Sequence, residues 1–158
     1  MQGNAIRDNG VYIFQMYLDK LEKHKDFGIL LTRIGIAITY VIIHGGPKIM
    51  GGPARWEKLG GAMGNLGVDF APVFWGFMAA FSEFGGGILL GLGLLYRPAS
   101  LFLMFTMFVA AVTHLSGGDG WGKASHAIEM CILFLGAFFI GPGKYSLDTL
   151  ISKFRKKE

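Results

Sequence analysis

Charged and imidazole side chains interrupt long apolar stretches of this chain, where such residues are costly and mark candidate functional sites. Carboxylates and histidines in these surroundings can exchange protons, and lysine or arginine can hold an anionic or carbonyl-bearing ligand. The candidates are His44, Lys48, Glu83, His114, His126 and Glu129, together with Arg33 and Arg97. What they can do depends on which segments cross a membrane and how deep each side chain lies.

Glu83 is the most unusual of these residues because it lies about ten residues inside the apolar run 73–96. At about 1.5 Å per residue, this run forms a helix of roughly 36 Å, long enough to cross a bilayer. A carboxylate near its middle costs several kcal/mol unless it is paired or protonated. Glycines at 85–87, 91 and 93 leave the helix surface bare, so neighbouring helices can approach closely. The run is predicted to carry both a packing seam and an intramembrane ionisable group.

The composition is typical of a protein that crosses the bilayer several times. Hydrophobic residues make up 52% of the 158 residues, mean hydropathy is +0.45 and charged residues are 16%, against about 25% in soluble domains. The net charge of +4 comes from residues at the ends of apolar runs, which indicates contact with lipid rather than nucleic acid. Cys131 is the one cysteine, so a disulfide within the chain and a dithiol relay are excluded.

The apolar pattern predicts an all-α fold, an integral membrane four-helix bundle over residues 27–143 with an N-terminal amphipathic surface helix. Residues 11–25 alternate apolar and charged faces at helical spacing, which predicts that this helix lies on the membrane. A contact face for another subunit is the alternative. The predicted spans are residues 27–44, 73–96, 99–114 and 123–140, between an N-terminal cytoplasmic segment, 1–26, and a basic cytoplasmic tail, 144–158.

The distribution of Lys and Arg predicts the orientation in a bacterial-type inner membrane. The face with both termini and the turn at Arg97 holds 10 of them, and the face with loops 45–72 and 116–124 holds 4. The positive-inside rule therefore places both termini in the cytoplasm. With that orientation, four candidates lie toward the outer side: His44, His114, His126 and Glu129. Arg33 lies nearer the inner side, where it either snorkels to the interface or pairs with a carboxylate.

Three interpretations of this outer-half cluster stay open. The first is structural, with histidines at the polar interface and Glu83 bonded to a neighbour. The second is a metal or haem site. Di-metal bundles use two Glu-x-x-His pairs, however, and this chain has one pair in the reverse order, His126-x-x-Glu129, so no metal ligands are assigned. The third is a site for a quinone or another small proton-coupled ligand, which needs an apolar slot beside polar groups.

Short motifs, in this order along residues 27–150, resemble the DoxX family. They are His44-Gly45-x-x-Lys48, Ser82-Glu83-Phe84-Gly85-Gly86, Leu95-Tyr96-Arg97 and the closing segment GPGKYSLD over 141–148. The resemblance implies a small four-helix membrane protein related to DoxD, the membrane subunit of a thiosulfate:quinone oxidoreductase. By resemblance, His44, Lys48, Glu83 and Arg97 match motif positions, whereas His114 and His126 do not.

We therefore expect a redox-associated membrane subunit that binds a quinone or a similar ligand in the outer half of the bundle. The expected proton carriers are Glu83, His126 and Glu129, and the expected ligand contacts are His44, Lys48, His114, Arg33 and Arg97. A non-catalytic accessory subunit that stabilises a larger membrane complex is the alternative. Other membrane subunits or a second copy are the expected protein partners, and whether the chain turns over a substrate stays open.

Overall fold

A computed structural model describes the backbone of residues 2–156 and the side chains of residues 11–156, and no strand occurs in that part of the chain. The helices, in order, are α1 (Gln2–Lys23), α2 (Lys25–Thr39), η1 (Tyr40–Gly45), α3 (Gly46–Ile49), α4 (Gly52–Gly60), η2 (Gly61–Leu66), α5 (Pro72–Phe81), η3 (Ser82–Gly86), α6 (Gly87–Leu92), α7 (Tyr96–Ser116), α8 (Gly120–Ile140) and α9 (Leu147–Arg155). η1 and η3 are π-helical, and η2 is a 3₁₀-helix.

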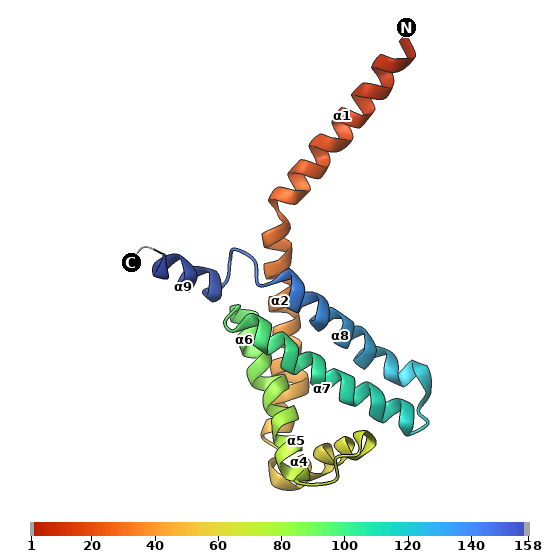
Figure 1. Cartoon of the computed structure of the whole chain (residues 1–158), viewed down its shortest axis with the longest axis vertical. Helices are drawn as coiled ribbons and strands as arrows, with labels where there is room; N and C mark the ends of the chain where they lie inside the picture. The colour runs from red at the N-terminus through yellow and green to blue at the C-terminus, as the bar shows by residue number, and fades with distance from the viewer. Residues whose placement is uncertain (1, 157–158) are drawn as a thin grey trace.

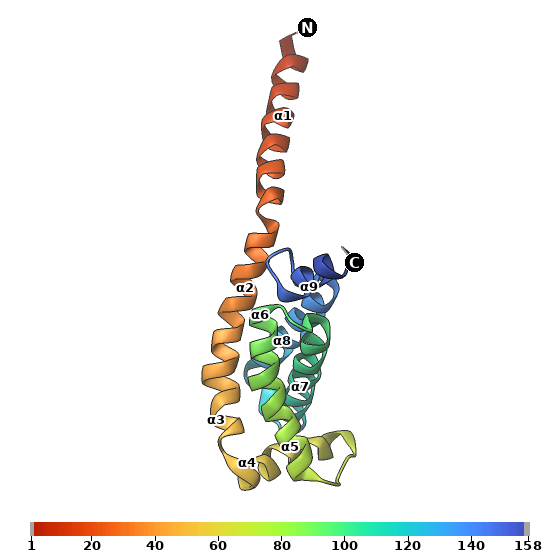
Figure 2. The ribbon, with the colours of Figure 1, turned by 90° about the vertical axis from the view of Figure 1, so that its left-hand side faces the viewer.

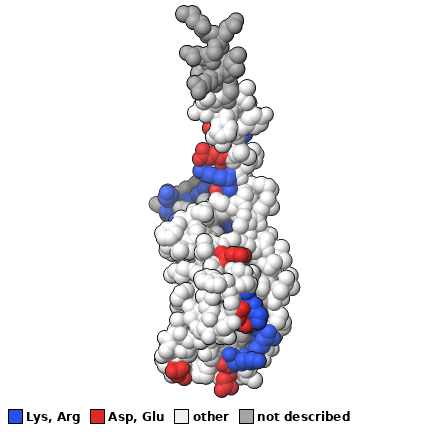
Figure 3. Space-filling model, turned by 90° about the vertical axis from the view of Figure 1, so that its right-hand side faces the viewer, with Lys and Arg blue, Asp and Glu red and all other residues white. Residues whose placement is uncertain are grey.

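Four of the continuous helical segments are long and apolar enough to cross a membrane: Lys25–Ile49, Pro72–Leu92, Tyr96–Ser116 and Gly120–Ile140. The expected all-α membrane bundle is confirmed. Figures 1 and 2 show α7 beside α8 and α2 beside α6, with all four segments forming one bundle. Figure 3 shows mostly uncharged surface over the bundle, as lipid contact requires, with most charged residues toward its two ends and one acidic patch between them.

The turn between the second and third spans lies earlier in the chain than the sequence pattern placed it. Gly93 and Leu95 adopt left-handed backbone conformations, with φ of 64° and 45°, and end the second span after Leu92. Arg97 therefore belongs to the first turn of α7. The carboxylate of Asp148 accepts hydrogen bonds from the backbone N–H groups of Leu95 and Tyr96, both at 2.9 Å, which holds this tight turn in place.

The two ends of the bundle carry different elements. α4 and η2 cover the end near residues 50–70, and α9 lies at the opposite end, pointing away from the spans (Figure 1). α1 precedes α2 and is joined to it by a turn at His24. It extends away from the bundle (Figures 1 and 2). Its exposed apolar side chains include Phe14, Leu18 and Leu21. That α1 lies on the membrane surface stays a prediction.

Glycines form the seams along which the second span packs. A Cβ atom at Gly45 of η1 would lie 2.6 Å from the Cα atom of Phe84 in η3, and one at Gly91 would lie 2.8 Å from the Cβ atom of Ala37 in α2. Real Cβ contacts are essentially never that short, so these positions admit only glycine without movement of a helix. Of the predicted seam glycines, Gly87 and Gly91 therefore face η1 and α2, whereas Gly86 faces Leu103 of α7.

The η1–η3 seam can be tested with one pair of substitutions. Gly45→Ala forces two backbones apart and is expected to destabilise the protein by about 1–3 kcal/mol. Gly35→Ala on the same span meets nothing within 4 Å and is expected to be neutral or slightly stabilising. Unfolding midpoints in mixed micelles measure both. Equal midpoints for the two variants would rule out the close approach.

Candidate functional site

Two π-helical segments meet in the middle of the bundle and carry several of its polar side chains. η1 (Tyr40–Gly45) and η3 (Ser82–Gly86) interrupt two adjacent spans and pack against each other. A π-helical turn is rare, and it occurs frequently at functional sites because it widens the helix and redirects side chains. The histidine of η1 and the carboxylate of η3 are thereby placed in the same region of the bundle.

Glu83 forms an ion pair with Lys48. Glu83 is 1% exposed, and the Lys48 Nζ atom lies 2.6 Å from each of its carboxylate oxygens. Oε1 accepts the hydrogen bond, while Oε2 has no aligned donor among the described residues. The Trp56 indole donates to the Lys48 backbone carbonyl at 2.9 Å and fixes the chain around the lysine. The carboxylate therefore has the partner that its depth requires, and one oxygen can still accept a hydrogen bond.

Aromatic and imidazole rings form the second part of the cluster. The ring centroid of His44 lies 5.1 Å from that of Tyr40 and 5.5 Å from that of His126, with which it stacks. Tyr40 is 1% exposed, and its hydroxyl has no hydrogen-bond partner among the described residues. His44 is half-buried and His126 is exposed on α8. These three rings therefore extend from the buried η1 segment to the surface of the bundle.

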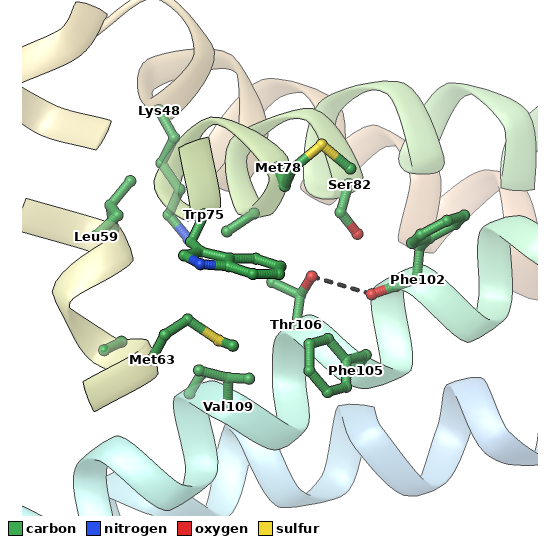
Figure 4. Close-up of a pocket in the computed structure, with 13 residues that line it drawn as sticks. Lys48, Leu59, Met63, Trp75, Met78, Ser82, Phe102, Phe105, Thr106 and Val109 are labelled. Carbon is green, nitrogen blue, oxygen red and sulfur yellow. Dashed lines mark hydrogen bonds between the residues drawn. The ribbon is translucent and has the colours of Figure 1, made fainter. Parts of the chain in front are cut away.

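A largely apolar cavity of about 220 Å³ lies on the other side of Lys48, between η2, α5 and α7. Figure 4 shows the Trp75 ring in its centre, with Met78 and Ser82 on one side and Met63 on the other. The Trp75 Nε1 atom and the Ser82 hydroxyl are both buried without a hydrogen-bond partner in the described structure. Buried donors of this kind are rarely left unpaired, so they point to a missing acceptor. The remaining lining residues are Leu59, Ala62, Ala79, Phe102, Phe105, Thr106, Val109 and Ala110.

Four of the sequence candidates lie together and the others lie apart. His44, Lys48, Glu83 and His126 belong to the cluster described above. His114 instead contacts Asp119 in the loop before α8, at 2.9 Å. Lys123 and His114 hydrogen-bond to Asp119 and hold the pKa of that carboxyl below its ordinary value. The sequence pattern did not separate these two groups of residues. The position of a residue in an apolar span gives the depth of its side chain in the membrane but not the direction in which the side chain points.

Glu129 and the two arginines occupy other surfaces. Glu129 is exposed on α8, and no hydrogen bond or ion pair of its side chain occurs within the described residues. Arg97 donates its Nε–H to the Phe138 carbonyl at 3.1 Å. Arg33 donates to the carbonyls of Pro142 and Tyr145 at the end of the bundle where α9 begins. Neither arginine reaches the Glu83 cluster.

Two residues of the site were missed by the sequence analysis. Tyr40 lies four residues before His44, one helical turn away, and Trp75 lies in the first turns of the second span. Both have a polar atom on an aromatic ring inside an apolar span, which is a weak signal because such residues also populate membrane interfaces. No group of three or more His, Cys, Asp or Glu residues that could hold a metal ion occurs in the described part of the chain.

Comparisons with known proteins give one matching family model and two bacterial relatives. The DoxX family model matches residues 28–115. The inner membrane protein YqjF of Escherichia coli K12 is 30% identical over 139 residues, which cover 84% of this chain and 98% of that protein. The inner membrane protein YphA of the same organism is 30% identical over 140 residues, covering 80% of this chain and 96% of that protein. No solved structure gives a significant match.

The Lys48–Glu83 pair should dominate the stability of this region. Lys48→Met leaves a buried carboxylate without its cation and is expected to cost about 3–5 kcal/mol, whereas Glu83→Gln with Lys48→Met should cost clearly less than the sum of the single changes. Unfolding in mixed micelles of the wild type, both single variants and the double variant gives the coupling. Additive losses would show that the two side chains do not depend on each other.

Proposed function

The chain belongs to the DoxX family, and we propose that it is a redox-associated membrane subunit that binds a quinone or a similar ring-bearing carbonyl ligand beside Lys48. The single observation that carries this proposal is the apolar cavity between η2, α5 and α7, which contains the unpartnered donors of Trp75 and Ser82. Because the cavity lies among apolar spans, a membrane-soluble ligand is favoured over a water-soluble one.

The residues of the cavity fit the head group of such a ligand. Its volume of about 220 Å³ exceeds the roughly 150 Å³ apolar cavity that holds a benzene molecule. The Trp75 indole N–H and the Ser82 hydroxyl can each donate to a carbonyl oxygen, and each would then gain the partner that it lacks. The walls of Met and Phe side chains suit the faces of a ring.

Lys48 connects the cavity to the proton-exchanging groups. A quinone, when bound and reduced, takes up two electrons and two protons. Lys48 lines the cavity and also bonds Glu83, so a proton given up on the cavity side can be replaced through the carboxylate. In this proposal His44 and His126, whose rings stack between the buried η1 segment and the bundle surface, continue the proton route from Glu83. The electrons come from a partner subunit that carries its own cofactor.

One observation favours the alternative, an accessory subunit of a larger membrane complex. Glu129 lies about nine residues inside the fourth span, is exposed, and makes no ion pair within the described residues. An unpaired carboxylate that faces lipid costs several kcal/mol, so a neighbouring subunit with a cation or a donor at that depth would stabilise it. This role does not require the cavity, and the two proposals can be separated by experiment.

Binding of a short-chain benzoquinone to the purified protein in detergent tests the leading proposal. Quinones quench indole fluorescence on contact, so saturable quenching that is lost in Trp75→Phe is the expected result. Ala110→Phe fills the cavity and should weaken binding about tenfold or more. Leu101→Phe places the same side chain on the exposed face of the same helix and should bind normally. Unsaturable quenching, equal in all four proteins, would overturn the proposal.

The accessory role is tested by comparing Glu83→Gln with Glu129→Leu in native membranes. If the chain mainly stabilises a complex through α8, Glu129→Leu should shift its native electrophoretic mass to that of the isolated subunit, and Glu83→Gln should not. If it mainly handles protons, Glu83→Gln should lower quinone-dependent electron transfer with the complex intact. A complex unaffected by Glu129→Leu would argue against a contact at that residue.

A further inference from the structure

Arg33 is a buried cation that forms no direct ion pair with a carboxylate of the described residues. The residue is 3% exposed, and no ion pair of Arg33 occurs within the described side chains. Two of the five N–H donors of its guanidinium go to backbone carbonyls, those of Pro142 and Tyr145. Its Nε atom is buried and has no partner in that part of the chain. Carbonyl oxygens satisfy donors but leave the positive charge in place.

A cavity of about 330 Å³ opens beside this arginine, between α2, α6 and α8. It lies at the end of the bundle where α9 begins, because Arg33 contacts the segment just before α9. Its walls are mostly apolar, and its polar margin consists of Arg33, Lys25, Thr32 and Tyr96. The apolar lining is formed by Gly28, Ile29, Ile36, Leu90, Leu133, Ala137 and Ile140.

We propose that this cavity binds an anionic phospholipid. The phosphate group lies at the Lys25 and Arg33 end, and an acyl chain follows the apolar groove between α2 and α8 toward Ile36 and Leu133. An anion there gives Arg33 a direct ion pair, and basic pockets between spans on the cytoplasmic side are suited to anionic head groups. The Lys25 Nζ atom lies 3.1 Å from a carboxylate oxygen of Glu22. Because this ion pair is exposed, it is weak, and Lys25 can exchange Glu22 for the phosphate group.

The shape of the cavity distinguishes a phospholipid from the other source of the same chemistry, free phosphate. A phosphate ion would use the basic margin alone, whereas the groove offers apolar area that only an acyl chain can cover. The site is also independent of the proposed quinone site. The two cavities share no lining residue. Loss of one site is therefore expected to leave the other intact.

Two glycines on α2 provide matched variants. Gly28 lines the cavity and Gly35 does not, and a Cβ atom at either position meets nothing within 4 Å. Gly28→Leu is therefore expected to fill the groove without a clash in the free protein, and Gly35→Leu adds the same side chain elsewhere on the same helix. Thr32→Phe, at an exposed lining position, provides a second way to fill the groove if Gly28→Leu fails to fold.

Native mass spectrometry of the delipidated full chain in detergent tests the proposal, with phosphatidylglycerol, phosphatidylcholine and inorganic phosphate as separate probes. The expected result is one phosphatidylglycerol adduct with at least about tenfold preference over phosphatidylcholine. Gly28→Leu or Thr32→Phe should lose this adduct, Lys25→Gln should weaken it, and Gly35→Leu should keep it.

Three outcomes would overturn the proposal. Equal binding of phosphatidylcholine would show that the charge is not recognised. Phosphate that binds and protects the protein from thermal unfolding as well as phosphatidylglycerol does would assign the site to a free anion. Retention of the adduct in both Gly28→Leu and Thr32→Phe would place the lipid elsewhere. Quinone titration of the same variants separates this site from the proposed function, since quinone binding should be unchanged.

Discussion

A carboxylate in the apolar interior of a membrane bundle is the constraint on which the central architecture depends. A buried carboxylate there is costly without a cation, and Lys48 from the end of the first span supplies one at 2.6 Å from Glu83. To make this contact, the first and second spans must lie close together at η1 and η3. Gly45 permits that approach because its side chain is absent at the point where it meets Phe84. The ion pair, the glycine seam and the π-helical segments therefore depend on one another.

The end of the bundle that carries α9 depends on a different network, built mainly from hydrogen bonds to backbone groups, with one long ion pair between Lys144 and Asp26 at 3.9 Å. Asp148 holds the turn that precedes α7, and Arg33 holds the segment that precedes α9. The closing GPGKYSLD motif is therefore used structurally here, since its Asp148 accepts from backbone N–H groups and its Pro142 and Tyr145 carbonyls accept from Arg33. Within the described residues, this network leaves Arg33 without a direct ion pair, whereas the Glu83 cluster leaves one carboxylate oxygen and the Tyr40 hydroxyl without a hydrogen-bond partner.

Several features could be predicted from the sequence because they depend on the length and hydropathy of one segment or on the charge of one residue. Length and hydropathy were sufficient for the four spans, and the cost of Glu83 in a bilayer required a partner. The identity of the partner did not follow, because it depends on how two helices are rotated. The same limit explains why Glu129 was grouped with His126: three residues apart on α8, they share a helix side, but only His126 contacts a neighbouring ring. Trp75 and Tyr40 were missed because an aromatic residue in a span is ordinarily a packing residue.

The paired π-helical segments also restrict how this chain can change in length. A π-helical turn holds an extra residue in a widened turn, so removing one residue from η1 would convert it toward an α-helix while the residues that follow keep nearly the same direction. Lys48 would then still face Glu83, but the widened turn at which η1 meets η3 would be lost. Insertions and deletions near residues 40–45 and 82–86 therefore change the contact between two segments that are far apart in the chain. In homologues of this fold, the spacing between the histidine and the lysine of the first span should vary less than the loops on either side.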